Sequence, residues 1–418
     1  MGQSGATGTY LWCVSFTDAN IGTAVGDYGL ILRTTNGGAN WTNQSNGKMD
    51  GLFSVSFIDA STGTAVGQLG RILHTTDGGT SWASQSSGRP YDLYGVSLVD
   101  ASTGTAVGKF GTILRTTNGG DSWTSQSSGV SGGLHDVCFV DASNGTVVGE
   151  YGTILRTTDG GAHWTIQSSG TTNHLLSISL ADANTGTAVG YFGTIRRTTN
   201  GGTSWTAQPS GTTNHLLGAS FPDADNGTVV GSAGTIVHTT DGGQSWTGQS
   251  SGTTTGLNSV SFTDAHHGTV VGQFGTILHT TYGGALWTSQ SSGSTSGLSD
   301  VCFTDDNTGT VVGDNGTVLR TTNGGLISTP PSDIILSQNY PNPFNPITTI
   351  RFWVPRSEFV SVEVFDILGH EVAHLASKDF AVGFHEARWD AHDFPSGVYF
   401  YRLEAGGFIE TKKLMLLR

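Results

Sequence analysis

The chain has 418 residues, of which 63 are glycine and 12% are charged, and its formal net charge is −14. With 18 Lys and Arg residues in total, it offers no basic stripe to neutralise phosphates, so nucleic acid and anionic lipid are excluded as expected partners. No stretch is apolar enough to span a membrane, and the abundance of Gly, Ser and Thr predicts an all-β protein of short strands and many turns. We expect no cofactor.

A repeat with a period of 41 residues runs from the N-terminus to about residue 326. Its most regular part is a Thr-Asn/Asp-Gly-Gly turn followed by tryptophan, as in Thr35–Trp41. Gly-Gly accepts positive φ, the Asn or Asp side chain can bond the amides of its own turn, and the tryptophan anchors the unit. The motif residues are Asn36, Trp41, Asp77, Trp82, Asn118, Trp123, Asp159, Trp164, Asn200, Trp205, Asp241, Trp246, Trp287 and Asn323.

One unit, residues 93–133, shows the expected strands. Leu93–Leu98 alternates and is expected to be innermost, and Thr105–Gly108 is a short second strand. Thr112–Thr117 is the third strand and Trp123–Gln126 the outer one. Four strands in about 41 residues is the length of a propeller blade, and eight copies predict eight blades.

The turn motif resembles the Asp-box (BNR) repeat of β-propellers. Its longer form, Ile154–Gly161 followed by Trp164, is most similar to propellers related to photosystem II assembly factors. The resemblance implies an eight-bladed β-propeller over residues 1–326, which we expect to be a monomer. Asp-boxes also occur in sialidases, sortilin-type receptors and xyloglucanases, so the motif indicates a scaffold and not an activity.

The two ends of the repeat are complementary. Gln3–Gly5 lies one period before Gln44–Gly47 in the same register, whereas the eighth unit has lost its outer strand after Gly325. We therefore expect the N-terminal segment to complete the last blade and close the ring. Met1–Gly8 has neither the basic nor the apolar region of a signal peptide, and the alternative is that residues before Met1 are missing.

Turns after the second and fourth strands of a propeller blade share one face, and here those turns differ from blade to blade. Polar groups beside Tyr and Phe on a concave face suit stacking on sugars or gripping a peptide. The alternative is neutral variation on exposed turns. The expected binding residues are Asp27, Tyr28, Gln68, Arg89, Tyr91, Lys109, Phe110, Glu150, Tyr151, His174, Tyr191, Phe192, His215, Gln273 and Phe274.

An enzymatic alternative rests on acids of the same face. A retaining glycosidase needs two carboxyls about 5 Å apart and an inverting one about 6.5–9.5 Å. Asp27 and Asp314 would be neighbours across the closure, with Glu150 further round. We favour ordinary solvated acids, because catalytic propellers usually interrupt the repeat with a long loop and this chain has no insertion.

Other polar groups predict structural roles. His266 and His267 have no further ligands nearby in the sequence, so we predict no metal site. A bridge between Cys13 and Cys302 is conceivable if the ring closes, but free buried thiols are favoured. A ring of basic residues is expected to make ion pairs or hydrogen bonds with repeated aspartates such as Asp18 and Asp141; it comprises Arg33, His74, Arg115, Arg156, Arg197, His238, His279 and Arg320.

The repeat ends before residues 327–334, which read as a linker around Pro330 and Pro331. Alternating segments then predict a small antiparallel β-sandwich; they are Thr348–Phe352, Val360–Gly369, His385–Asp390, Ser396–Leu403 and Lys412–Arg418.

Residues 335–418 resemble the C-terminal sorting domain (type A) of the type IX secretion system, an Ig-like β-sandwich. The residues that carry the resemblance are Asn339, Pro341, Asn342, Pro343, Phe344, Gly397, Tyr399, Lys412 and Lys413. It implies export by the type IX machinery to the surface or surroundings of a Gram-negative bacterium of the Bacteroidetes–Chlorobi–Ignavibacteria type, and the tail is often removed. Such cargo also needs an N-terminal Sec signal, which this sequence lacks, so we read its start as processed or truncated.

Together these features predict a secreted or cell-surface binding module for a glycan, a polysaccharide or a protein. A glycoside hydrolase or lyase of the Asp-box propeller type is the alternative. A third interpretation is an assembly or stability scaffold, as the photosystem-factor resemblance suggests.

Overall fold

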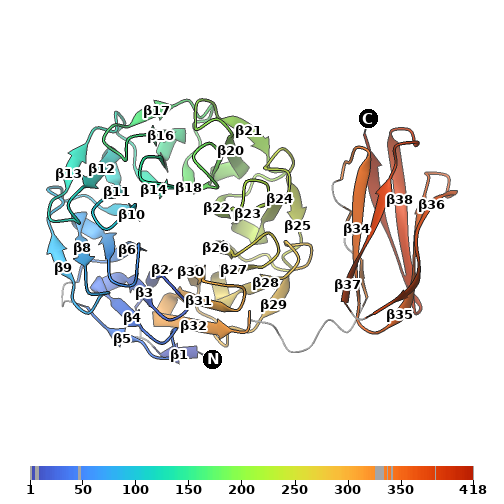
Figure 1. Ribbon diagram of the computed structural model, residues 1–418, viewed down its shortest axis with the longest axis horizontal. Coiled ribbons are helices and arrows are strands. Elements are labelled where there is room, and N and C mark those ends of the chain that lie inside the picture. The colour runs from blue at the N-terminus through green and yellow to red at the C-terminus, as the bar shows by residue number, and fades with distance from the viewer. Residues whose placement is uncertain are drawn as a thin grey trace. The chain divides into compact units, whose positions relative to one another are not determined.

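The computed structural model describes residues 2–4, 9–45, 49–324, 334–336, 338–339, 342–381 and 383–417. Contacts divide the chain into two units, Met1–Leu326 and Ile327–Arg418. Within the described part of the first unit, the strands form eight four-stranded antiparallel sheets, which are the blades of the ring in Figure 1. The predicted eight-bladed all-β propeller is confirmed. The predicted linker 327–334 lies, apart from Ile334, outside the described residues.

The strands of each blade follow one another from the centre of the ring outward. The innermost strands are β2 (Leu11–Phe16), β6 (Leu52–Phe57), β10 (Leu93–Leu98), β14 (Leu134–Phe139), β18 (Leu175–Leu180), β22 (Leu216–Ser220), β26 (Leu257–Phe262) and β30 (Leu298–Phe303). The second strands are β3 (Gly22–Gly26), β7 (Gly63–Gly67), β11 (Gly104–Gly108), β15 (Gly145–Gly149), β19 (Gly186–Gly190), β23 (Gly227–Gly231), β27 (Gly268–Gly272) and β31 (Thr308–Gly313).

The third strands are β4 (Ile31–Thr34), β8 (Ile72–Thr75), β12 (Thr112–Thr116), β16 (Ile154–Thr157), β20 (Thr194–Thr198), β24 (Ile236–Thr239), β28 (Ile277–Thr280) and β32 (Thr317–Thr322). The outer strands of the first seven blades are β5 (Thr42–Asn43), β9 (Ala83–Gln85), β13 (Thr124–Gln126), β17 (Thr165–Gln167), β21 (Thr206–Pro209), β25 (Thr247–Gln249) and β29 (Thr288–Gln290). Short 3-10 turns join the second and third strands; they are η1 (Asp27–Gly29), η2 (Gln68–Gly70), η3 (Lys109–Gly111), η4 (Glu150–Gly152), η5 (Tyr191–Gly193), η6 (Ser232–Gly234), η7 (Gln273–Gly275) and η8 (Asp314–Gly316).

The N-terminal strand β1 (Gly2–Ser4) is the outer strand of the eighth blade. It pairs antiparallel with β32, so that Gly2 lies opposite Leu319 and Ser4 opposite Thr317. The innermost strands β2 and β30 are also in contact. The expected closure of the ring by the N-terminal segment is therefore confirmed.

The apolar core lies between blades. Val107 and Ile113 of the third blade, for example, pack against Leu134, Val137 and Trp164 of the fourth. Similar clusters join the other neighbouring blades. Because a single blade leaves both of its faces apolar, each blade depends on its neighbours for burial.

The Asp-box turn has the geometry that its residues predict. The Asn36 side-chain oxygen accepts the Asn40 N–H at 2.9 Å, and the Thr34 hydroxyl accepts the Gly38 N–H at 2.7 Å. Equivalent bonds to Asp77 and Asp159 recur in the second and fourth blades. These turns therefore satisfy their own amides, which marks them as scaffold.

The ring of basic residues corrects one expectation. Asp141 accepts the backbone N–H groups of its own turn, from Ser143 and Asn144. Arg156 instead donates to the backbone oxygens of Gly201 and Ala183 in the next blade. Arg115 and Arg197 likewise donate to backbone oxygens of the next blade. Among the described residues no arginine of this ring forms an ion pair or a hydrogen bond with an aspartate, so the predicted pairing with aspartates is wrong for the arginines.

The histidine of this ring in the seventh blade predicts a loss of stability in acid. His279 is 3% exposed, and its Nδ1 lies 3.0 Å from the Thr269 hydroxyl. Burial, with a smaller effect of the His267 charge, lowers the His279 pKa from 6.5 to about 4. Neutral His279 therefore contributes fully to the free energy of unfolding above pH 6.5. This contribution, up to ~3 kcal/mol, is lost as the pH falls toward 4.

Urea unfolding at pH 7 and pH 4.5 measures this effect. His279→Arg puts a permanent cation where other blades hold Arg33 or Arg156, so the variant should lose less stability than the wild type between the two pH values. An equal loss in both proteins would contradict the assignment. Some acid sensitivity should remain, because burial also lowers the pKa of His74.

The cysteines are free. Cys13, Cys138 and Cys302 lie on innermost strands and are partly buried, and no disulfide joins Cys13 to Cys302. Burial raises the pKa of Cys138 and of Cys302 to about 11. The favoured interpretation as free thiols on the inner strands agrees with this setting.

The second unit contains two sheets. One holds β33 (Ile335–Leu336), β34 (Ile347–Val354) and β37 (Gly383–Asp390), and the other holds β36 (Glu371–Phe380), β35 (Glu358–Phe365), β38 (Gly397–Ala405) and β39 (Phe408–Leu416). Both sheets supply residues to one apolar core. The strand expected at Val360–Gly369 ends at Phe365, and β36 was not predicted.

The residues that carry the sorting-domain resemblance belong to this fold. Asn339 is 2% exposed; its backbone N–H donates to the Tyr401 hydroxyl and its side chain to Thr348. Phe344 is buried and bonds β39 through its backbone. Asn342 accepts the Met415 N–H, and Pro343 follows it. Gly397 and Tyr399 lie on β38, and Lys412 and Lys413 lie on β39. Pro341 lies outside the described residues.

In the part of the chain that the structure describes, no helix has the length and apolar character needed to cross a membrane.

Candidate functional site

The variable turns lie on one face of the ring. The Asp27 N–H at the start of η1 donates to the Tyr10 oxygen in the loop that precedes β2, at 2.9 Å. The Glu150 N–H bonds the Gly133 oxygen in the same way at 2.8 Å. The Asp-box turns instead bond the turns after the innermost strands, as Gly37 does with Asn20. We call the face formed by the η turns and the crossing loops the variable face.

The second residue of every η turn has a left-handed backbone, with φ between 53° and 57°. An L-residue there costs about 1 kcal/mol, yet six blades place a large apolar side chain at this position. These side chains are all more than 60% exposed; they are Tyr28, Leu69, Phe110, Tyr151, Phe192 and Phe274. The turn therefore holds aromatic and aliphatic tips out into solvent, which is typical of an interaction surface.

A second set of rings lines the inner wall and was missed by the sequence reasoning. Trp12, Phe53, Tyr94 and His135 occupy the second position of β2, β6, β10 and β14. The ring centroids of Trp12 and Phe53 are 6.5 Å apart, those of Phe53 and Tyr94 are 6.0 Å apart, and those of Tyr94 and His135 are 5.9 Å apart. Comparing one repeat position across all blades, and not one turn, would have found them.

The row of rings continues into the crossing loops. His174 stacks on Tyr191 at 5.2 Å with an interplanar angle of 5°, and Tyr191 contacts His215 at 4.4 Å. His135 and His174, at 6.4 Å, connect this group to the inner wall. We call the whole row the aromatic arc; it comprises Tyr10, Trp12, Phe53, Tyr94, His135, His174, Tyr191 and His215.

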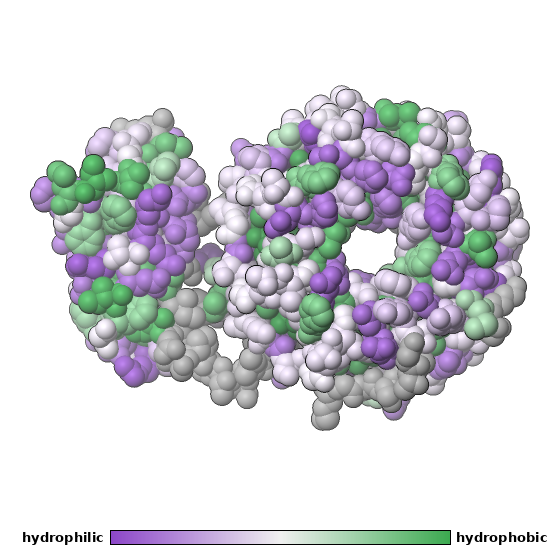
Figure 2. Space-filling model, turned by 180° about the vertical axis from the view of Figure 1, so that it is seen from behind, coloured by the Kyte–Doolittle hydropathy of each residue, from purple (hydrophilic) through white to green (hydrophobic). Residues whose placement is uncertain are grey.

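The aromatic arc is one-sided. At the inner-wall position the fifth and sixth blades carry Leu176 and Leu217, and the seventh and eighth carry Asn258 and Ser299. The residue before the innermost strand is a ring in the first, fifth and sixth blades, and it is glycine in the second, fourth, seventh and eighth. Figure 2 shows the opening at the centre of the ring. Its rim is thus apolar and flat on one side and small and polar on the other.

The remaining predicted face residues support the loops. The Gln68 side chain accepts the Gly51 N–H at 3.0 Å, and Gln273 accepts the Gly256 N–H at 3.4 Å. Lys109 pairs with Asp92 at 2.7 Å, and this hydrogen bond raises the Lys109 pKa.

Other face residues make ring contacts or stand exposed. Phe110 meets Tyr91 edge to face at 5.0 Å, and Phe192 meets His215 in the same way at 5.1 Å. Arg89 is exposed.

The three candidate acids each contact a different group of the protein. Asp27 accepts the Trp12 indole N–H at 2.7 Å, and Glu150 accepts the Gly133 N–H at 3.0 Å. Asp314 lies against Gly297 in the eighth blade, and partial burial raises its pKa. Each acid therefore has a local structural environment of its own.

Burial shifts the pKa values of two inner-wall residues, His135 and Tyr94. Burial lowers the pKa of His135 below its usual value, although the Glu150 carboxylate opposes this effect. Burial raises the Tyr94 pKa. His135 is consequently neutral at pH 7, with a lone pair available on its ring.

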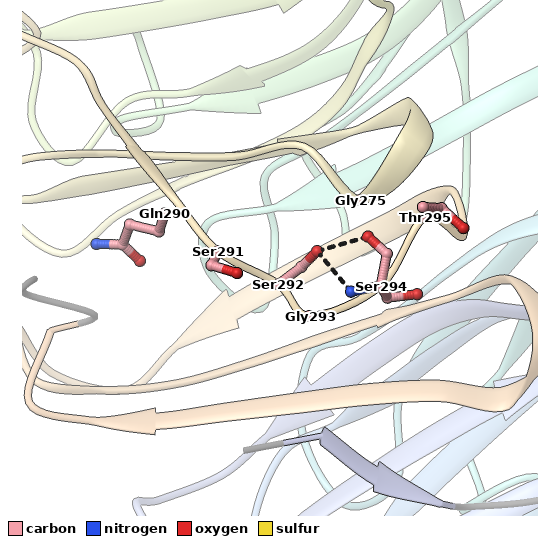
Figure 3. A pocket seen from close by; sticks show the side chains of 7 residues that line it. All are labelled: Gly275, Gln290, Ser291, Ser292, Gly293, Ser294 and Thr295. Carbon is pink, nitrogen blue, oxygen red and sulfur yellow. Dashed lines mark hydrogen bonds between the residues drawn. The ribbon is translucent and has the colours of Figure 1, made fainter.

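Shallow polar grooves lie between the η turns and the ends of the outer strands in the fourth, fifth and seventh blades. Figure 3 shows the one lined by Gly275 and residues 290–295. There the Ser292 hydroxyl donates to the Ser294 oxygen and accepts the Ser294 N–H. Because the same turn recurs with its polar groups internally bonded, we assign these grooves to the scaffold.

The fold and the Asp-box turns define the first unit as an eight-bladed propeller of the Asp-box class. Matches to the family described as photosynthesis system II assembly factor YCF48 cover residues 6–137, 129–210, 166–247 and 207–295. The chain belongs to this family. Residues 338–417 match the secretion system C-terminal sorting domain, which marks a secreted or cell-surface protein.

Solved structures share the fold at low identity. One titled YCF48 bound to D1 peptide is 18% identical with a TM-score of 0.54, and covers 77% of this chain and 94% of its own. YCF48 from Cyanidioschyzon merolae is 20% identical with a TM-score of 0.54, covering 77% and 98%. The computationally designed Ika8 protein is 12% identical with a TM-score of 0.64, covering 77% and 98%. A search of curated protein sequences finds no match.

Proposed function

We propose that the propeller is a secreted binding module that holds a glycan chain on the aromatic arc. The one-sided row of rings at the rim of the central opening is the observation that carries this proposal. Flat rings suit the apolar faces of sugar units, and neighbouring acceptors such as Asp27 and Glu150 suit their hydroxyls. Tyr10 and Trp12 are the most open part of the arc, at 46% and 40% exposed, with their rings stacked at 5.7 Å.

Removing two rings of the arc should weaken binding without loss of the fold. Tyr94→Leu copies Leu176 and Trp12→Ser copies Ser299, so both substitutions place residues that the scaffold already uses at this position. Each ring contact contributes about 0.5–1.5 kcal/mol, so the double variant should bind about tenfold more weakly. Affinity electrophoresis against xyloglucan, xylan, mixed-linkage glucan and pullulan identifies a retained polysaccharide, and calorimetry measures the change.

Asn258→Ser is the matched control, because it alters the same position on the side without rings. It should leave affinity unchanged. If the double variant bound the polysaccharide with unaltered affinity, the aromatic arc would not be the binding site.

A peptide ligand is the second candidate. It is favoured by the fold similarity to the structure titled YCF48 bound to D1 peptide. A peptide array probed with the wild type and with the double variant distinguishes the candidates, since signals lost with the rings would indicate peptide binding at the same face.

The hydrolase alternative gains no support from the acids. Glycoside hydrolysis needs a carboxyl pair that flanks the scissile bond. Here Asp27 accepts an indole N–H and Glu150 accepts a backbone N–H, so each acid already takes part in a separate structural contact.

We further propose that the sorting domain directs export through the type IX machinery to the surface of a Gram-negative cell.

A further inference from the structure

Three potential metal ligands converge beside the aromatic arc. His135 comes from β14, Glu150 from η4, and His174 from the loop before β18. Their ligand atoms all lie within 4.8 Å of one another. We propose that these three side chains form a binding site for a divalent transition-metal ion, with zinc preferred. This revises the prediction of no metal site.

The chemistry of the donors selects the metal. Two imidazoles and one carboxylate are a zinc set, whereas calcium and magnesium prefer oxygen ligands. Zinc–nitrogen bonds of about 2.0–2.1 Å require ligand atoms somewhat closer together than the outer limit of this cluster, which side-chain rotation can provide. Three protein ligands leave a fourth position for water or for an oxygen atom of a bound molecule.

The surroundings hold the ligands in place. One Glu150 oxygen, Oε2, accepts the Gly133 N–H at 3.0 Å, which orients the carboxylate as outer-shell partners of metal ligands do. His174 is held between Tyr191, at 5.2 Å, and Tyr151, at 5.3 Å. The His135 Nε2 is shielded from solvent and has no hydrogen-bond partner within the described chain. Buried polar atoms normally have a partner, and a bound metal ion would supply one here.

The cluster is not a property of the scaffold. One blade further on, the three equivalent positions hold Leu176, Tyr191 and His215, and only the last could bind a metal. The repeat thus builds this combination in the fourth blade from three positions that are filled differently elsewhere.

Two other clusters are weaker candidates. In the Asp264, His267 and Asp306 cluster, His267 already bonds Asp264 at 2.8 Å and Asp306 accepts the Thr263 hydroxyl. In the Glu363, Glu371 and His374 cluster, Glu363 pairs with Arg402. Their polar groups are therefore satisfied without a metal.

Zinc binding by the tag-free full chain tests the proposal directly. After treatment with EDTA and its removal, zinc is titrated in competition with a chromophoric chelator. One high-affinity zinc per chain should be displaced by neither calcium nor magnesium. His174→Ala and Glu150→Gln should each weaken this binding by about 100-fold or more, since even outer-shell changes cost 10- to 100-fold.

The variants separate metal binding from folding. Glu150→Gln should keep the bond to the Gly133 N–H, as Gln68 does with Gly51, so its melting temperature without metal should match the wild type. His163→Ala is the control, because it removes an exposed histidine of the same blade at the Asp-box turn, and it should bind zinc normally. Absence of a stoichiometric zinc, or unchanged zinc affinity in His174→Ala and Glu150→Gln, would overturn the proposal. The assay needs no glycan, so its result is independent of the proposed function.

Discussion

Arg156→Ala is expected to destabilise the propeller by about 3 kcal/mol or more. Arg156 is 6% exposed, and its guanidinium donates to Gly201 and Ala183 in the fifth blade and to Gly145 and Asn144 in its own blade. Truncation removes the donors, leaves buried carbonyl oxygens without partners and opens a cavity between blades. The change is measured by urea unfolding at pH 7.

Two substitutions calibrate this effect. Arg156→His copies His74, which bonds the Thr64 hydroxyl within its own blade, and Thr146 offers the same group in the fourth blade. Its loss should therefore be smaller than that of Arg156→Ala. Arg89→Ala, at an exposed position, should change stability by no more than about 0.5 kcal/mol. If Arg156→Ala were as mild as Arg89→Ala, the bonds between blades would not stabilise the ring.

Deletion of residues 335–418 is expected to abolish export almost completely while leaving the propeller folded. The apolar clusters between the blades contain residues of the first unit alone, and the core of the second unit is its own. Each unit therefore has an apolar core of its own. The measurement is the distribution of the protein between periplasm, cell surface and medium in a host with a type IX machinery.

The full chain and the truncated chain should carry the same added Sec leader, so that both reach the periplasm. The truncated protein should remain there with the melting temperature of a folded propeller. A fusion of residues 335–418 to a periplasmic reporter tests sufficiency. Equal amounts of the full and truncated chains outside the cell would contradict the role of the tail in sorting.

Much of the fold could be predicted because each blade is a local unit. The innermost strand predicted at Leu93–Leu98 has those bounds in β10, and the other strands of that blade differ by a residue at an end. In the tail, β36 was missed, since Glu371–Phe380 is an edge strand whose side chains are mostly exposed or half-buried. Without a buried face, such a strand has no apolar alternation to recognise.

The candidate site was predicted only in part. The exposed tips, such as Tyr151 and Phe274, follow from the variable turns, and their outward direction agrees with that prediction. The inner wall was missed because each innermost strand contains a β-bulge. Leu11 pairs with Gly26 and Cys13 with Val25, so Trp12 is the extra residue between them. A prediction that assumes strict alternation along the strand gives the wrong direction for the side chain of a bulge residue.

The sequence alone determined the period, the number of blades, the closure by the N-terminal strand and the two-part organisation, because these depend on local turns and on a count. Only the tertiary structure decided which side chains meet. Trp12, Phe53, Tyr94 and His135 lie one period apart in the chain and become neighbours when the ring closes. The meeting of His135, Glu150 and His174 likewise depends on a bulge, a left-handed turn and a crossing loop from adjacent blades, and spacing along the chain does not encode that geometry.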